Sequence, residues 1–447
     1  MKLPLRVGLL LAATYACWTS AVCLAEDWPQ WMGTKRDAVW RETGIIEKFP
    51  ASGPKVLWRV PVHGGYAGPA VAEGRVYVTD LVTAADTKSV SNPMSRPEIN
   101  GEERIVCFDA QTGREIWKHA YPCKYAISYP CGPRCTPTVH QGKVYALGAE
   151  GHLFCLDATK GTVLWSKDFK ADFGAKTPVW GFCSHPLVDG QKLICVVGGK
   201  DAVAYAFDKD TGKVLWQALE ASGPGYSPPT LIEAGGTRQL LIWHTQALNG
   251  LDPETGRVYW SVKLEPQFGM SIMAPRQLGD KLFAGGIGGV SVLLQLAADK
   301  PAVTELWRGS MKTGASPVNA TPFLENGFMY AVDQPGTLMG VNLENGQRVW
   351  ETFKPISEDP NARRISSGTA FLVKNGERFF LFAETGNLII ARLTPKGYDE
   401  ISRTKLLEPT GMAFSDRDVV WSHPAFANKC VFARNDKELV CASLAAE

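Results

Sequence analysis

The sequence predicts an all-β fold, an eight-bladed β-propeller built from four-stranded antiparallel blades. Three observations predict it. The chain of 447 residues is rich in glycine, proline and tryptophan and lacks long amphipathic helical patterns. A phrase that ends in tryptophan returns roughly every four dozen residues, a period typical of propeller blades. Four short β-type runs separated by turns fill each interval, and radial repetition of such units protects their sheet edges.

The recurring phrase defines the blade. In "AFDKDTGKVLW", Asp208 and Gly212 are placed to form the turn between the third and fourth strands, because Asp bonds turn amides and Gly adopts positive φ. Trp216 then lies on the outer strand, where its ring can fill the gap to the next blade. A catalytic group has no reason to occur once per blade, so the phrase is predicted to be structural. Its terminal tryptophans are Trp58, Trp117, Trp165, Trp216, Trp260, Trp307 and Trp350.

The two ends of the chain are predicted to complete one blade together. The C-terminal block after Ile401 offers three strand-like runs, "VVWSHPAF", "KCVFARN" and "ELVCASL", and no fourth. Near the other end, "PKVLWRV" is a lone fourth strand with Trp58, and pairing it with the last strand closes the ring. Two repeats depart from the pattern: the fifth lacks Asp and Gly before Trp307, and the seventh ends in "GYDEI" without tryptophan. The expected domains are a signal peptide at 1–25, a leader at 26–54 and a single propeller at 55–447.

The N-terminus predicts export. Lys2 and Arg6 precede a short apolar run, and small residues before Glu26 predict cleavage after Ala25. The run is shorter than a bilayer span, and no other segment resembles one. We therefore expect a periplasmic or secreted protein, and a monomer. The formal net charge of +2, with both signs interspersed, gives no electrostatic reason to expect nucleic acid as a partner.

Cysteine positions leave one question open. Removal of Cys17 and Cys23 with the signal peptide leaves nine of the eleven cysteines. Cys107 and Cys155 stand two residues before the repeated Asp, on a strand expected to be buried, and are predicted to be core thiols. The nearby group Cys123, Cys131 and Cys135 is compatible with one local disulfide in a loop.

The repeats resemble a known family. "DAQTGREIW", "DKDTGKVLW" and "DPETGRVYW" are similar to the tryptophan-docking motif of the pyrroloquinoline-quinone-like (PQQ-like) propellers, over nearly the whole mature chain. The leader "DWPQWMGTKRDAVW" resembles the start of secreted members. The family includes quinoprotein alcohol dehydrogenases and the BamB-type outer-membrane assembly protein. For an enzyme of this family, the resemblance implies PQQ stacked on an aromatic ring, Ca²⁺ held by oxygen ligands and an Asp base.

A non-repeating ring of residues is the candidate site. The inner strands are predicted to begin after a proline in seven blades and at Ala370 in the seventh blade. The residues three positions earlier share a strand face with those one position earlier. The first set is Tyr66, Arg134, Cys183, Tyr226, Ile272, Asn319, Ser367 and Trp421. The second set is Gly68, Thr136, His185, Pro228, Ala274, Thr321, Thr369 and His423.

Five members of this ring are the candidate cofactor- or ligand-binding residues: Arg134, His185, Asn319, Trp421 and His423. Trp421 offers a stacking platform, Arg134 a cationic partner and Asn319 an oxygen ligand. His185 and His423 occupy equivalent "SHP" positions, which fits a metal pair, an acid/base couple or two imidazoles bonded to neighbouring backbone. We assign no catalytic residue and no metal ligand.

Other polar groups are placed near the same face. Asp80, Glu150, Asp333 and Glu384 lie at the turn between second and third strands, where they either reach the axis or are solvated. The polar insertion from Leu81 to Glu103 emerges there and is either a lid or a disordered loop. Arg363 and Arg364, with Arg134, suggest an anionic ligand.

Two functions are compatible with these observations. The first is an exported, non-catalytic binding or scaffold protein that holds an unknown protein partner or a small anionic ligand on the ring face. The alternative is a PQQ- and Ca²⁺-dependent dehydrogenase acting on alcohols, sugars or polymeric alcohols. The ring carries no carboxylate, whereas Ca²⁺ prefers six to eight oxygens that commonly include Asp or Glu.

Overall fold

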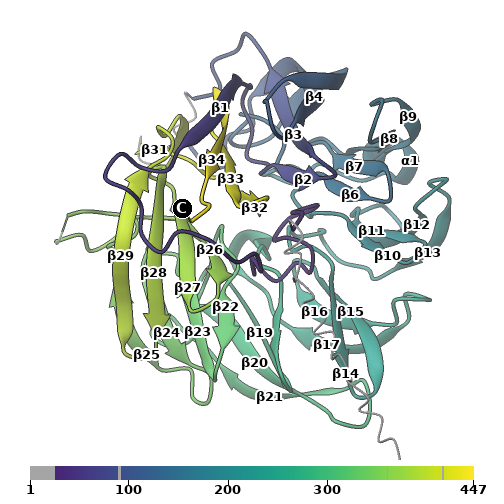
Figure 1. The fold of residues 1–447 in the computed structure, drawn as a ribbon. Helices are drawn as coiled ribbons and strands as arrows, with labels where there is room; N and C mark the ends of the chain where they lie inside the picture. Colours follow the sequence, from purple (N-terminus) through teal and green to yellow (C-terminus); the bar gives the residue numbers. More distant parts are fainter. Residues whose placement is uncertain (1–25, 89–91, 360, 415–416, 447) are drawn as a thin grey trace, which may run out of the picture.

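A computed structural model describes residues 26–88, 92–359, 361–414 and 417–446. Within them, eight four-stranded antiparallel sheets are arranged radially around one axis (Figure 1). Seven blades run outward in chain order, from the inner strand to the outer strand, and in the eighth the outer strand is β1. The predicted propeller and its blade number are confirmed.

The first four blades follow the chain without interruption. Blade 1 contains β2 (Ala70–Ala72), β3 (Arg75–Val82), β4 (Glu98–Asp109) and β5 (Glu115–Ala126). Blade 2 contains β6 (Thr138–His140), β7 (Lys143–Leu147), β8 (His152–Asp157) and β9 (Val163–Asp168). Blade 3 contains β10 (Leu187–Asp189), β11 (Lys192–Val196), β12 (Ala204–Asp208) and β13 (Val214–Ala218). Blade 4 contains β14 (Thr230–Ala234), β15 (Thr237–Trp243), β16 (Ala247–Leu251) and β17 (Val258–Lys263).

The last four blades end where the chain began. Blade 5 contains β18 (Arg276–Leu278), β19 (Lys281–Gly286), β20 (Val290–Leu296) and β21 (Val303–Arg308). Blade 6 contains β22 (Phe323–Glu325), β23 (Phe328–Val332), β24 (Leu338–Asn342) and β25 (Arg348–Thr352). Blade 7 contains β26 (Ala370–Asn375), β27 (Arg378–Ala383), β28 (Asn387–Thr394) and β29 (Gly397–Lys405). Blade 8 contains β32 (Ala425–Ala427), β33 (Cys430–Arg434), β34 (Glu438–Ser443) and β1 (Val56–Pro61).

Blade 8 closes the ring as predicted. Strand β1 pairs antiparallel with β34, with Arg59 opposite Val440. The run "VVWSHPAF" is not one strand, however. Val419 ends the small hairpin of β30 (Gly411–Ala413) and β31 (Arg417–Val419), and only Ala425–Ala427 form the inner strand. Pro424 explains the break, because it lacks the N–H that a continuous ladder requires.

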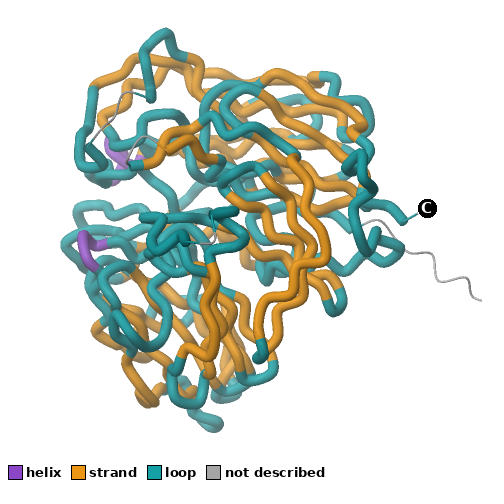
Figure 2. The backbone as a smooth tube through the Cα atoms, turned by 90° about the vertical axis from the view of Figure 1, so that its left-hand side faces the viewer, coloured by secondary structure: helices purple, strands orange, loops and turns teal. Residues whose placement is uncertain are grey.

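Connecting loops gather on one side of the ring. The side view shows the strands making up the body of the blades, with the two short helices in loops on the same side (Figure 2). These are α1 (Phe169–Phe173) and the 3₁₀ helix η1 (Gln267–Gly269). No helix within the described ranges has the length and hydropathy of a membrane span.

The repeated tryptophan bonds six of the eight blades to the next one. The Trp165 indole N–H donates to the Lys209 carbonyl at 3.0 Å, and its ring lies against Gly212 of blade 3. The turn is built as expected, because Asp208 Oδ1 accepts from the Thr211 N–H at 2.8 Å and Gly212 has a φ of 71°. The same indole bond joins Trp58 to Ala110, Trp117 to Ala158, Trp216 to Pro253, Trp307 to Leu343 and Trp350 to Thr394.

A bulge directs each of these rings into the seam between blades. In blade 3, Ala206 pairs with Trp216 while Phe207 pairs with Val214, so Leu215 is the extra residue. An extra residue of this kind bends the outer strand and increases its twist. Leu215 is therefore exposed, and corresponding leucines in other blades are exposed for the same reason. These apolar residues on the rim are a consequence of the blade geometry.

Both departures from the repeat have a structural reason. The fifth repeat does have an Asp, Asp299, but the β20–β21 ladder runs further past its bulge than in blades 1–4 and the connection contains no Gly. Trp260 of blade 4 therefore donates instead to Gln239 Oε1 of its own blade at 2.7 Å. Blade 7 lacks a tryptophan, and its neighbour, blade 8, has the chain ends in place of the third turn. Where the docking turn of the next blade is absent, the tryptophan is either absent, as in blade 7, or bonds within its own blade, as in blade 4.

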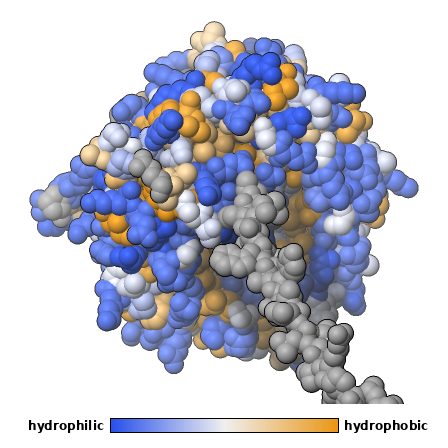
Figure 3. All heavy atoms as spheres, in the orientation of Figure 1, coloured by the Kyte–Doolittle hydropathy of each residue, from blue (hydrophilic) through white to orange (hydrophobic). Residues whose placement is uncertain are grey.

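The leader lies across the centre of the face seen in Figure 1. Trp28 pairs with Val71 of β2, and Val39 pairs with Lys374 of β26. Trp40 is fully buried against Phe380 and Phe426, and its N–H donates to Glu42 at 2.7 Å. Hydrophilic side chains cover most of this face (Figure 3). The leader therefore connects several blades at one end of the axis. The predicted signal peptide, residues 1–25, lies outside the described residues.

The cysteine predictions have mixed outcomes. Cys107 and Cys155 are fully buried thiols, as expected. The possible local disulfide is not formed: Cys123, Cys131 and Cys135 are all free. Strand β5 extends to Ala126, so Cys123 belongs to a strand opposite Gly101, and Cys135 faces the Phe182 carbonyl at 3.6 Å. The three thiols contact different neighbours.

The closure of blade 8 predicts a cooperative loss of the whole ring. Replacing Lys55–Val60 with a Gly-Ser stretch of equal length removes the fourth strand and leaves β34 as an open edge. We expect a single unfolding transition at a markedly lower temperature, followed by circular dichroism. The same replacement at the exposed residues 298–300 is the control. Unchanged stability without the β1 sequence would contradict the closure.

The tryptophan seam predicts a difference between two glycines of equal backbone geometry. An alanine Cβ at Gly212 would stand 2.8 Å from the Trp165 ring, whereas at Gly142, with a similar φ of 72°, it would meet nothing within 4 Å. We expect Gly142→Ala to lose about 1 kcal/mol from left-handed strain, and Gly212→Ala to lose about 1–3 kcal/mol more from overpacking. Urea unfolding measures both. Equal losses would show that the seam tolerates the added methyl group.

Candidate functional site

A cavity of about 380 Å³ lies at the centre of the ring, between the leader residue Trp31 and the loops that enter the inner strands. All eight residues predicted three positions before the inner strands line it. They are Tyr66, Arg134, Cys183, Tyr226, Ile272, Asn319, Ser367 and Trp421. Four of the second set also line it: His185, Pro228, Thr321 and His423. The register read from the prolines thus brings all five candidate residues to one cavity.

A leader residue closes the inner end of the cavity. Trp31 is 5% exposed, lines the cavity and stacks on His185 with ring centroids 4.9 Å apart. Arg36 lies over the Trp31 ring and donates to the carbonyls of His185 and Pro186. Within the described residues, the Trp31 indole N–H has no hydrogen-bond partner. The repeat-based register missed Trp31, because the leader lies outside every repeat; the aromatic cluster "DWPQWMG" was the available indication.

The two histidines lie together in an edge-to-face arrangement, with their ring planes at 89°. Their ring centroids are 6.3 Å apart, and His423 also packs on Phe371 at 4.0 Å. His185 Nδ1 accepts the Thr136 N–H at 3.0 Å, so the neutral ring carries its proton on Nε2 and has no lone pair left for a metal. Burial lowers the pKa of His423 to about 3, and burial with His423 and Arg36 nearby lowers the pKa of His185 well below its usual value. Both rings are therefore neutral at physiological pH.

The Arg134 guanidinium holds a crossover loop. It donates to the backbone carbonyls of Trp180, Ser128 and Tyr129 at 3.0, 2.7 and 2.6 Å, and also to that of Gly132. Its plane lies 4.9 Å over the Tyr66 ring. Because most of its donors are already bonded, Arg134 gives little support to the anionic-ligand hypothesis. Arg363 and Arg364 are exposed and do not line the cavity.

Both predictions for the four carboxylates between the second and third strands, that they reach the axis or that they are solvated, are wrong. Asp80, Glu150, Asp333 and Glu384 neither line the cavity nor are solvated; they are 0–3% exposed. Each accepts a backbone N–H from the crossover into its own blade and pairs with one cation. The N–H donors are His63, Ala126, Ser316 and Thr369, and the cations are Arg104, Lys170, Arg348 and Arg417. These buried pairs position the loops that carry the ring, which explains their burial without a catalytic role.

The ring polar groups are similarly engaged. Trp421 donates its indole N–H to Glu384 at 2.9 Å, which fixes its ring on the cavity wall. The Asn319 amide N–H donates to Thr369 at 2.9 Å, which leaves its carbonyl oxygen for a ligand. Both candidate residues are held by a group outside the cavity.

Exposed apolar side chains surround the mouth of the cavity. Met94, Phe268 and Phe414 line it and are 46%, 61% and 47% exposed. Met94 belongs to the insertion, whose ends extend the β3–β4 ladder through Val82 and Glu102. Arg96 anchors the insertion to the Ala126 and Thr177 carbonyls. The described part of the insertion therefore packs at the cavity, as expected of a lid. The sequence offered no pattern for the other two residues, which lie in irregular loops.

The wall does not fit PQQ with Ca²⁺. Trp180 and Trp421 suit a planar ring, but the described lining residues include no Asp or Glu, whereas Ca²⁺ sites commonly contain them. Arg134, the cation in this wall, already holds backbone carbonyls and is poorly placed to bind the carboxylates of PQQ. The donor set of the cavity is aromatic, with amide and hydroxyl oxygens.

Comparisons with known proteins agree with this architecture. A family model described as "Outer membrane protein assembly factor BamB" (PQQ_2) matches residues 101–273 and 244–447. The BamB protein of Moranella endobia is 27% identical over 54% of this chain and 60% of its own length. Quinohemoprotein alcohol dehydrogenase ADH IIB of Pseudomonas putida is 27% identical over 41% of this chain and 28% of its own length.

One solved structure illustrates the shared fold. The crystal structure of BamB from Moraxella catarrhalis matches with a TM-score of 0.55 at 13% identity, covering 87% of this chain and 97% of that one. At such identity the likeness concerns the fold alone. The chain spans 56% to 63% of the length of the BamB relatives that it matches first.

The buried histidines predict acid sensitivity. Their pKa values are lowered in the folded protein, so on acidification the unfolded chain binds protons that the folded chain excludes. Stability should therefore fall as the pH drops below about 6.5, by up to about 1.4 kcal/mol per pH unit for each ring. We expect His423→Gln to reduce this slope in urea unfolding between about pH 7 and about pH 4.5. The exposed His63→Gln is the control; the same slope in all three proteins would contradict the prediction.

Proposed function

The chain belongs to the family described as outer membrane protein assembly factor BamB, and we propose that it is an exported, non-catalytic binding protein that holds a segment of a partner protein at the axial cavity. The N-terminal charge and apolar pattern supports export. The names of the BamB relatives support a role among other proteins. The cavity itself carries the argument.

The aromatic wall is the observation that supports the proposal most directly. Eight aromatic residues line the cavity: Trp31, Tyr66, Tyr129, Trp180, Tyr226, Phe268, Phe414 and Trp421. Aromatic rings supply large apolar contact areas, and Tyr and Trp add a polar atom to it, which is why they dominate recognition sites. A cavity of about 380 Å³ accommodates one or two large side chains rather than a folded domain.

The mouth supports a polypeptide as the occupant. Met94, Phe268 and Phe414 remain exposed around it, and exposed apolar side chains gathered at one place commonly mark an interaction site. Asn319, Gln334, Ser366 and Ser367 add amide and hydroxyl groups to the wall, which suit the N–H and C=O groups of a peptide backbone. An extended segment that inserts an aromatic or aliphatic side chain satisfies both features.

The proposal predicts binding of apolar peptides through the exposed mouth. The probes are labelled peptides of one length in which a central Phe, Leu, Ser or Asp stands in a Gly-Ser background, and anisotropy measures affinity. We expect the Phe and Leu peptides to bind best, and Phe268→Ala/Phe414→Ala to weaken binding at least about tenfold. Both positions are exposed, so the fold should be unaffected.

Controls distinguish binding at the cavity from nonspecific binding to exposed apolar side chains and from dehydrogenase activity. Leu164→Ala/Leu215→Ala removes equally exposed side chains from outer strands and should leave affinity unchanged. Equal loss in both double variants, or equal binding of all four peptides, would contradict the proposal. Saturable PQQ binding with Ca²⁺ and reduction of an electron-acceptor dye would replace it with the dehydrogenase alternative.

A further inference from the structure

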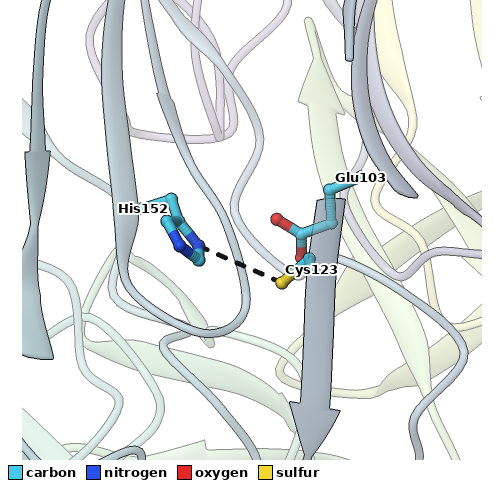
Figure 4. A group of neighbouring side chains, drawn as sticks. All are labelled: Glu103, Cys123 and His152. Atoms are coloured by element: carbon cyan, nitrogen blue, oxygen red, sulfur yellow. Dashed lines mark hydrogen bonds between the residues drawn. The ribbon is translucent and has the colours of Figure 1, made fainter. Parts of the chain in front are cut away.

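A second cluster of reactive side chains lies away from the axis, at the seam between blades 1 and 2. Glu103 of β4, Cys123 of β5 and His152 of β8 direct one ligand atom each toward a common point (Figure 4). These atoms all lie within 4.8 Å of one another, and Cys123 Sγ is 4.0 Å from His152 Nδ1. Two blades thus contribute to one constellation.

The burial of Glu103 leaves a negative charge without a cation. Glu103 is 1% exposed, and within the described residues it takes part in no ion pair. Its oxygens accept from the hydroxyls of Tyr121 and Tyr125 and from the Ala149 N–H at 3.0 Å. These bonds hold the carboxylate in place but do not neutralise it, and a buried carboxylate is normally paired or bound to a metal.

Gly148 allows the carboxylate to cross the seam. A Cβ at this position would lie 2.2 Å from Glu103 Oε2 and 2.3 Å from the Tyr121 hydroxyl oxygen. Gly148 and Ala149 belong to the turn of blade 2, whereas Glu103 comes from blade 1. The absence of a side chain at Gly148 therefore brings Glu103 close to His152.

His152 has the surroundings of a metal-binding imidazole. Its Nδ1 faces Cys123, and its Nε2 lies 3.8 Å from Asp168 Oδ2. The other oxygen of Asp168 accepts the N–H groups of Lys170 and Ala171 at the start of α1, so the carboxylate is anchored. Metal-bound histidines commonly direct their second nitrogen to such a carboxylate, which fixes the ring orientation and the tautomer.

We propose that Glu103, Cys123 and His152 form a zinc site that joins blades 1 and 2. A thiolate, an imidazole and a carboxylate are the ligands that Zn²⁺ prefers, whereas Ca²⁺ and Mg²⁺ take oxygen ligands throughout. Bonds of about 2.0–2.3 Å in a tetrahedron place ligand atoms about 3.5 Å apart, so small side-chain rotations complete the site. Three protein ligands leave the fourth position of the tetrahedron for water, and His152, 26% exposed, is the ligand nearest to solvent.

Cobalt titration of the full exported chain, first freed of metal with a chelator, tests the donor set. Co²⁺ at a site with a thiolate ligand produces a charge-transfer band in the near ultraviolet, and we expect one equivalent per chain. Cys123→Ser should abolish the band, and His152→Gln should weaken Co²⁺ binding at least about tenfold. Cys195→Ser, a buried thiol in blade 3, is the matched control and should keep the band. A band that survives Cys123→Ser, or no band in the unmodified chain, overturns the proposal.

Thermal unfolding gives a second readout that does not depend on the spectrum. Zn²⁺ that binds the folded chain and joins two blades should raise the midpoint of unfolding in the unmodified chain and in Cys195→Ser. The midpoint of His152→Gln should not respond, and this partly exposed position makes a folded variant available should Cys123→Ser fail to fold. An equal response of His152→Gln and the unmodified chain also overturns the proposal.

Discussion

The seam between neighbouring blades is the constraint on which the rest of this structure depends. Twisted sheets that radiate from an axis diverge toward the periphery, and the widening gap must be filled. Here an indole ring fills it and also donates a hydrogen bond to the next blade, as Trp165 does to Lys209. The glycine beneath the ring, Gly212, permits this close approach. Repetition of one contact therefore builds the ring.

The exceptions show that docking needs two partners, the tryptophan of one blade and the turn between the third and fourth strands of the next. Where the turn of blade 5 lacks its motif, Trp260 turns to Gln239 of its own blade. At blade 8 the chain ends replace the turn, and blade 7 carries no tryptophan. There, Arg59 of β1 donates to the Leu406 carbonyl, which follows blade 7, at 3.1 Å. On the other side of blade 8, Arg434 is fully buried and donates to the Thr79 carbonyl of blade 1 at 2.6 Å, in addition to the docked Trp58. Most neighbouring blades are joined by a docked tryptophan, whereas the contacts of blade 8 with its neighbours also include arginine side chains bonded to backbone carbonyls.

Hydrogen bonds and ion pairs near the axis hold the crossover loops, and these loops form the cavity. Buried carboxylates such as Asp333 and Glu384 bind the crossover loops by their N–H groups, and cations from the same region balance the charge. Arg134 similarly binds four carbonyls. Charged groups near the axis therefore act on the backbone, and what remains facing the cavity is aromatic and neutral. This division explains why charge in the sequence was a poor guide to ligand chemistry.

The sequence by itself determined the repeat, the number of blades, the joining of the two ends and the register of the ring, because these depend on residues at fixed spacing. The prolines before the inner strands were sufficient to place Arg134, His185, Asn319, Trp421 and His423 around one cavity. Only the tertiary structure decided what those residues do. Whether Arg134 or Glu384 is free depends on how the irregular crossover loops fold around them, and Trp31 reaches the cavity from a leader without any repeat. The meeting of Glu103, Cys123 and His152 depends likewise on the seam between two blades, which no local pattern records.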